Sequence, residues 1–120
     1  MAKDLKISLL LDFYGDMLTE KQREVVDFYY NDDLSLSEIA ENEGITRQGV
    51  RDSIKRAEAQ LLEMEERLGL VKRFREMEQG LQRIREAADH IREYNEHNVY
   101  AREIEENAKL IAGIARGLCE

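Results

Sequence analysis

LSEIAENEGITRQGVRDSIKRAEAQL, residues 36–61, is the stretch of sequence that decides the fold. Its first part predicts a short helix, with Ile39 and Ala40 facing inward and Ser37 capping the first turn. Gly44 fits the left-handed residue that commonly ends a helix. The segment therefore predicts a short helix that stops at a tight turn.

A second helix is expected to begin at Arg47, directly after Thr46, which is a favourable N-cap residue. Spacings of four, three and four positions place its apolar residues on one buried stripe, namely Val50, Ile54, Ala57 and Leu61. The small side chain of Ala40 would let the second helix cross the first one closely. Two helices joined in this way form a helix-turn-helix, whose predicted core comprises Ile39, Ala40, Gly44, Val50 and Ile54.

The polar side of the second helix carries side chains that can read bases. In a helix-turn-helix, the N-terminal residues of this helix lie nearest the base edges in the major groove. Arginine can pair with guanine through two hydrogen bonds, and glutamine can pair with adenine in the same way. At roughly 100° per residue, the predicted base-reading residues share one side: Arg47, Gln48, Arg51 and Lys55. Thr46 and Arg56 are predicted to contact phosphates.

A second interpretation of the same segment stays open. Charged residues on one side of a helix are usually solvated, and a helix-turn-helix also serves as a compact protein-binding unit. Four basic minus two acidic residues give residues 46–60 a charge of +2, whereas the whole chain, with 18 Lys and Arg against 26 Asp and Glu, carries −8. This negative balance disfavours nonspecific binding to a polyanion. Nucleic acid and protein are therefore both candidate partners.

Apolar periodicity predicts further helices before the motif. Residues 5–18 form one expected helix, and its apolar stripe comprises Leu9, Leu10, Phe13, Tyr14 and Leu18. Thr19 is expected to cap a mostly buried helix that ends at residues 31–33. Gly69 is expected to interrupt the helical pattern. We therefore predict an all-α fold, with a helix-turn-helix domain of residues 5–69 that has no wing, followed by a helical extension of residues 70–120.

The extension contains two apolar runs with spacings of three and four, which are typical of short helical seams. Residues 96–98 form the expected loop between them. The first run comprises Leu81, Ile84, Ala88 and Ile91, and the second comprises Ala101, Ile104, Ala108, Ile111, Ala115 and Leu118. One antiparallel pair of helices would leave apolar surface in water. We therefore expect a homodimer, and the alternative is a hairpin folded back onto the N-terminal domain.

Composition limits the class of protein. The chain has 120 residues and contains neither proline nor tryptophan. Because proline breaks helices, its absence allows long uninterrupted helices. Its single cysteine, Cys119, can form neither an internal disulfide nor a zinc cluster, which suits the reducing cytoplasm. The apolar run of residues 7–11 is too short to span a bilayer, and no signal peptide precedes it. A soluble cytoplasmic protein without membrane insertion is expected.

No sequence pattern indicates catalysis. The chain lacks GxxxxGK[ST], GxGxxG, GxSxG and HExxH, so we expect no enzyme, no cofactor and no small-molecule substrate. A metal site could be imagined at residues that share one helical face, Glu86, His90, Glu93 and His97. Because they lie opposite the apolar residues of that helix, a solvated face explains them, and no metal is expected. Tyr14, Tyr29 and Tyr30 are interpreted as core residues rather than as a base-stacking platform.

The segment of residues 17–61 is similar to region 4 of sigma factors, and a narrower resemblance is to the YlxM family of small bacterial helix-turn-helix proteins. The residues that carry it are LLDFY (10–14), LT (18–19), YYNDDLSL (29–36), EIA (38–40) and TRQGVRDSIKR (46–56). The resemblance covers about half of the chain, from Leu9 to roughly Leu70. Residues 72–120 match no pattern and are expected to be longer than the family norm.

The resemblance implies a sigma region 4 fold and a regulatory role. Genes of this family tend to lie beside those of the signal recognition particle, which implies a part in that pathway through an associational argument. Three functions are therefore weighed. The first is a DNA-binding regulator; the second is an accessory protein that contacts the RNA or the GTPase of the signal recognition particle; the third is an RNA-polymerase-binding module.

Overall fold

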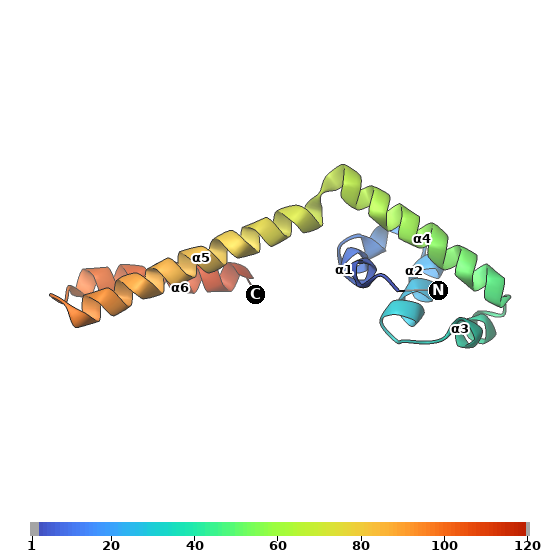
Figure 1. Cartoon of the computed structure of the whole chain (residues 1–120), viewed down its shortest axis with the longest axis horizontal. Coiled ribbons are helices and arrows are strands. Elements are labelled where there is room, and N and C mark those ends of the chain that lie inside the picture. Colours follow the sequence, from blue (N-terminus) through green and yellow to red (C-terminus); the bar gives the residue numbers. More distant parts are fainter. Residues whose placement is uncertain (1–2, 120) are drawn as a thin grey trace. The chain divides into compact units, whose positions relative to one another are not determined.

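The computed structural model describes residues 3–119, and within them every regular element is a helix (Figure 1). The predicted all-α class is therefore confirmed. The elements follow the chain as α1 (Leu5–Tyr14), η1 (Gly15–Met17, a short 3₁₀ helix), α2 (Glu20–Tyr30), α3 (Leu36–Glu43), α4 (Arg47–Leu68), α5 (Leu70–His97) and α6 (Arg102–Cys119).

The chain divides into two compact units, one ending at Val71 and the other starting at Lys72. The first unit contains α1 to α4, and the second contains most of α5 together with α6. Each unit has its own buried residues and is described by itself.

Helix α4 is the element against which the first unit is built. Its predicted stripe of Val50, Ile54, Ala57 and Leu61 is confirmed, since each of these side chains is fully buried. The N-terminal half of α4 packs against α2 and α3, in a cluster of Val25, Tyr29, Ile39, Ala40, Val50 and Ile54. Its C-terminal half packs against α1, where the cluster includes Ile7, Leu10, Leu11, Tyr14, Val26, Ala57 and Leu61. Helices α1, α2 and α3 thus support one side of α4.

The helix expected over residues 5–18 is shorter than predicted. The α-helix ends at Tyr14, and the chain tightens into the 3₁₀ helix η1 before Thr19 caps α2 through its hydroxyl. The predicted stripe also needs correction: Leu9 and Phe13 are only half-buried at the margin of the core. The fully buried residues of α1 are Ile7, Leu10, Leu11 and Tyr14. This set lies along both α2 and α4, so the covered face is broader than a single narrow stripe.

The predicted cap of α3 was wrong by two residues. Ser35, not Ser37, is the N-cap: its hydroxyl accepts a hydrogen bond from the Glu38 backbone N–H at 3.1 Å, and the Glu38 carboxylate accepts one from the Ser35 N–H at 3.1 Å. This reciprocal capping box satisfies two backbone donors at once. Ser37 is the second residue of α3 and lies inside its first turn. Ser35 and Glu38 have the three-residue spacing that distinguishes the box.

The second unit is a hairpin in which α6 runs back along α5 (Figure 1). Helix α5 continues to His97, so the loop expected at residues 96–98 lies at residues 98–101 instead. The buried amide of Asn95 closes this loop: its Nδ2 donates to the Ala101 carbonyl at 2.8 Å, and its Oδ1 accepts from the Ala101 N–H at 3.0 Å. Arg92 adds an ion pair to Glu105 at 2.8 Å. Asn95 thus satisfies both backbone groups of Ala101, the residue directly before α6.

Candidate nucleic-acid interface

The turn between α3 and α4 is fixed by backbone geometry. Gly44 has a φ of 66°, the left-handed conformation predicted for it, and the Ile45 N–H donates to the Ala40 carbonyl at 3.1 Å. Thr46 then caps α4, as predicted, by accepting a hydrogen bond from the Gly49 N–H at 2.9 Å. A Cβ atom at Gly49 would lie 3.1 Å from the Thr46 hydroxyl oxygen, so glycine leaves room for this cap. The start of α4 is therefore held in one position relative to α3.

The packing of α4 determines which of its sides faces water. Val50 and Ile54 are fully buried against Ile39 and Ala40, whereas Gly44, the fifth residue of the expected motif core, is exposed. The opposite side of the same helix must then be exposed. The residues that were predicted to contact nucleic acid are all exposed: Thr46, Arg47, Gln48, Arg51, Lys55 and Arg56.

Three of the predicted base-reading residues lie together. Arg47, Gln48 and Arg51 line a surface cavity of about 340 Å³, and its remaining wall is Leu36 at the start of α3. The cavity sits beside the first two turns of α4, the part of a helix-turn-helix that approaches base edges. Its polar side chains are thus held next to an apolar wall, the mixture that can accept a base edge and a thymine methyl group.

Lys55 lies one turn further along α4, and its position depends on Glu58 of the same helix and on Tyr30, a residue that sequence spacing could not identify. Its ammonium nitrogen is 3.8 Å from Glu58 Oε2, and the Tyr30 hydroxyl donates to Glu58 Oε1 at 2.7 Å. Burial and this hydrogen bond raise the pKa of the Tyr30 hydroxyl. Tyr30 precedes Glu58 by 28 residues, so no local periodicity relates them. An aromatic residue at the end of α2 thereby orients the carboxylate that holds Lys55.

The arginines of the site differ from Lys55 in their surroundings. Within residues 3–119, no carboxylate pairs with the guanidinium of Arg47, Arg51 or Arg56. Gln48 is engaged, because its Nε2 donates to Asp52 Oδ1 at 2.9 Å. At roughly 100° per residue, Arg56 lies on a different side of α4 from Arg47 and Arg51. The structure therefore groups Arg47 and Arg51 with Gln48, and leaves Arg56 apart.

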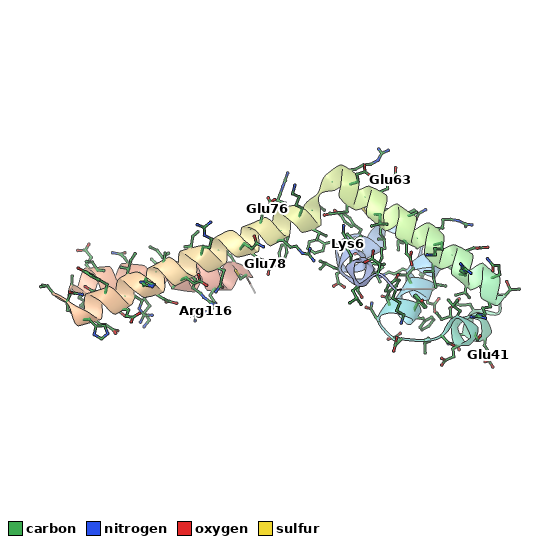
Figure 2. All side chains as sticks on the ribbon, in the orientation of Figure 1. Lys6, Glu41, Glu63, Glu76, Glu78 and Arg116 are labelled. Carbon is green, nitrogen blue, oxygen red and sulfur yellow. The ribbon has the colours of Figure 1, made fainter. Side chains whose placement is uncertain are left out.

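Helix α3 also carries acidic residues, and two of them are engaged within the fold. Glu38 belongs to the capping box, and Glu43 is 3.5 Å from Lys21 with only 7% of its side chain exposed. Glu41 remains exposed and points away from α3 (Figure 2). The negative charge of α3 is thus partly compensated within the fold, which leaves the cationic side of α4 less opposed than the sequence suggested.

The described residues also bear on two other kinds of site. Between residues 3 and 119, no group of three or more His, Cys, Asp or Glu side chains could hold a metal ion. None of the helices in that range is both long enough and apolar enough to cross a membrane. Tyr14 and Tyr29 are buried and Tyr30 is half-buried, in agreement with their interpretation as core residues.

Comparison with known proteins gives a consistent result. A family model described as "Putative helix-turn-helix protein, YlxM / p13 like" (UPF0122) matches residues 1–104. A UPF0122 protein from Thermoanaerobacter sp. (strain X514) is 48% identical over 107 residues, which cover 89% of this chain and 92% of the relative. Another from Halalkalibacterium halodurans is 49% identical over 89 residues, covering 74% and 82%. A third from Acetivibrio thermocellus is 57% identical over 74 residues, covering 62% and 63%.

These matches correct two expectations about the extension. The resemblance was expected to end near Leu70, and residues 72–120 were expected to be longer than the family norm. Both expectations were wrong, because the family model reaches residue 104 and the aligned 107 residues make up 92% of a relative of similar length. The family model thus includes all of α5 and the loop after it, and ends just after α6 begins.

Proposed function

The chain belongs to the UPF0122 family of YlxM-like helix-turn-helix proteins, and from this we propose that it is a regulatory protein that binds double-stranded DNA through α4. Arg47, Gln48 and Arg51 contact base edges in the major groove, with Lys55 beside them. Thr46 and Arg56 contact phosphates. Because its ligand is DNA and its relatives are bacterial proteins, it acts in the cytoplasm as a binding protein rather than as an enzyme.

One observation carries this proposal. Two unpaired arginines and a glutamine converge on a single cavity at the start of the second helix of a helix-turn-helix. Arginine and glutamine are the side chains best suited to bidentate recognition of guanine and adenine. Solubility alone would not require these three side chains at the start of α4, the part of a helix-turn-helix that lies nearest to base edges.

The negative charge of the chain sets the expected binding mode. With a formal charge of −8, long-range attraction to DNA is weak, and affinity must come from specific contacts made at short range. We therefore expect weak nonspecific binding and a clear preference for particular sequences, both sensitive to salt.

The decisive experiment is a selection of DNA sequences from a random library by the full chain at low salt. Enrichment of a defined sequence that disappears in the Arg47→Ala/Arg51→Ala variant supports the proposal. Failure to enrich any sequence overturns it. A parallel pull-down from bacterial extract, with and without nuclease, then distinguishes the alternatives. Recovery of signal recognition particle RNA or its GTPase in place of DNA would favour the accessory role in that pathway.

A further inference from the structure

Helix α6 carries two rows of residues with coiled-coil spacing, shifted from each other by one position. The first row faces α5 and is covered or half-covered, and it consists of Glu105, Ala108, Ala112, Ala115 and Cys119. The second row is exposed and consists of Ile104, Asn107, Ile111, Ile114 and Leu118. Both rows alternate steps of three and four, the spacing that lets a helix pack along a partner helix. Only one of the two rows has a partner in this unit.

Helix α5 shows the same arrangement. The row that faces α6 comprises Leu81, Arg85, Ala88, Arg92 and Asn95, and all of its members are buried or half-buried. The row one position earlier comprises Met77, Gly80, Ile84, Ala87, Ile91 and Tyr94, and all of its members except the half-buried Gly80 are exposed. Together with the exposed row of α6, these residues form what is called here the open face of the hairpin.

Both exposed rows lie on the same side of the hairpin. In two antiparallel helices, a shift of one residue in the same direction on each helix turns both rows toward the same face. The structure agrees, since Ile91 and Tyr94 of α5 line a cavity of about 350 Å³ together with Ile104 of α6. The other side of the hairpin is polar, where Gln82, Arg83 and Glu86 line a cavity beside Cys119. Figure 2 shows Glu76 and Glu78 pointing from opposite sides of α5.

The distribution of side-chain size indicates what the open face is for. The covered row of α6 uses alanines, which let two helices approach closely, whereas the large aliphatic residues are in water. Ile104 and Ile111 are 46% exposed, Ile114 is 55% exposed and Leu118 is 62% exposed. In a hairpin that worked alone, the isoleucines would be inside and the alanines outside. The sequence therefore places its strongest apolar surface where a second partner must cover it.

We propose that the open face binds the open face of a second copy of this chain, so that two hairpins form a four-helix bundle. The exposed rows of α5 and α6 need a partner that presents two helices with the same spacing, and an identical hairpin supplies them in a two-fold symmetric, self-complementary contact. Eight large side chains of the face are each at least 46% exposed, which together leave an area of the order of the ~800 Å² per partner that a stable interface buries. Acidic residues at its margins, such as Glu76 and Glu103, argue against an anionic membrane as the occupant.

Light scattering of the full chain at micromolar concentration tests the proposal. The expected mass is twice the 14.0 kDa of one chain. The variant Ile84→Glu/Ile111→Glu, which adds charge to both exposed rows, should have the mass of one chain and unchanged helical circular dichroism. Arg116→Glu, on a side chain that points away from α6 in Figure 2, is the matched control and should remain dimeric. Neither variant alters the proposed DNA-contacting residues, so this test is independent of DNA binding.

A milder variant keeps the test conclusive if the charged one fails to fold. Ile111→Ala retains a strong helix former and should raise the dissociation constant of the dimer by about tenfold or more, whereas Leu62→Ala on α4 should leave it unchanged. A mass of one chain for the unaltered protein would overturn the proposal. A dimer that persists at full affinity in both open-face variants would also overturn it, because the contact would then lie elsewhere.

Discussion

The hydroxyl of Tyr14 donates a 2.6 Å hydrogen bond to Glu65 Oε1, although the two residues are 51 positions apart. The same hydroxyl accepts from the Leu70 N–H at 3.1 Å, and Glu65 Oε1 accepts from the Val71 N–H at 3.1 Å. The first backbone donors of α5 have no partner within their own helix. Tyr14 and Glu65 satisfy them, so residues of α1 and α4 together determine how α5 begins after Gly69.

Replacing Tyr14 by Phe should lower the free energy of unfolding by about 1–3 kcal/mol, because the Leu70 N–H and the Glu65 carboxylate each lose a partner. Urea denaturation followed by circular dichroism measures the change. The matched control is Tyr100→Phe, since the Tyr100 side chain is 56% exposed and its hydroxyl can bond to water. An equal effect of the two variants would show that the hydrogen bonds of Tyr14 add nothing to stability.

Alkaline pH should destabilise the first unit through its tyrosines. Burial, with hydrogen bonds to carboxylates as a second cause, raises the pKa of both Tyr14 and Tyr30 above the ordinary value of 10.0. Below pH 10 both phenols are protonated in the folded and unfolded states, so their contribution to the free energy of unfolding is fully present. Above it the unfolded chain loses these protons first, and each tyrosine lowers the free energy of unfolding by up to about 1.4 kcal/mol per pH unit.

Denaturation curves between neutral pH and strongly alkaline pH check this dependence. Lysine side chains also titrate there, so the informative comparison is with the Tyr14→Phe and Tyr30→Phe variants. Each variant should show a shallower loss of stability above pH 10 than the unaltered chain. If the stability of all three proteins fell with pH in parallel, the raised pKa values assigned to Tyr14 and Tyr30 would be contradicted.

Replacing Arg47 and Arg51 by Ala should abolish sequence-specific DNA binding, with each bidentate contact contributing about 1–3 kcal/mol. Both side chains are exposed, so the unfolding free energy should stay within about 0.5 kcal/mol. Arg67→Ala is the control, because Arg67 lies at the far end of the same helix and pairs with Glu63. Fluorescence anisotropy with the selected sequence measures affinity. Equal losses in the variant and the control would indicate a general charge effect rather than base recognition.

Ile54→Ala should cost about 2–5 kcal/mol of stability, because Ile54 is 0% exposed and lies between α3 and α4. Leu62→Ala, a truncation at a site on α4 that is 41% exposed, should cost clearly less. Urea denaturation of both variants provides the comparison. A loss below about 0.5 kcal/mol for Ile54→Ala would mean that α4 packs through another side.

Gly44→Ala should destabilise the first unit by about 1–2 kcal/mol, because alanine is strained at a φ of 66°. A Cβ atom there would meet nothing within 4 Å, so the cost comes from backbone conformation alone. The control is Gly113→Ala inside α6, where a Cβ atom also meets nothing within 4 Å and alanine should favour the helix. In thermal unfolding, Gly44→Ala should lower the melting temperature and Gly113→Ala should raise it. A change in the same direction for both variants would contradict this expectation.

The sequence by itself determined the local features of this protein. The helices, the left-handed turn at Gly44, the cap at Thr46 and the buried stripe of α4 were all predicted, because each depends on residues within one or two turns of each other. The motif followed from the same short-range spacings, and the family from the resemblance of the quoted residues. The cap of α3 was missed although it is also local, because Glu38 stands three residues after Ser35, the spacing of a capping box, whereas Ala40 stands three residues after Ser37.

Only the tertiary structure decided which residues distant in the chain act together. Tyr14 with Glu65, and Tyr30 with Glu58, are pairings between helices that no periodicity encodes. The same holds for the hairpin: the sequence showed apolar runs in α5 and α6, but not that alanines would be covered while isoleucines remained exposed. A helix of given spacing can turn either of two neighbouring rows toward its partner. The close approach that alanines permit selects one row, and that selection becomes visible only when the helices are packed together.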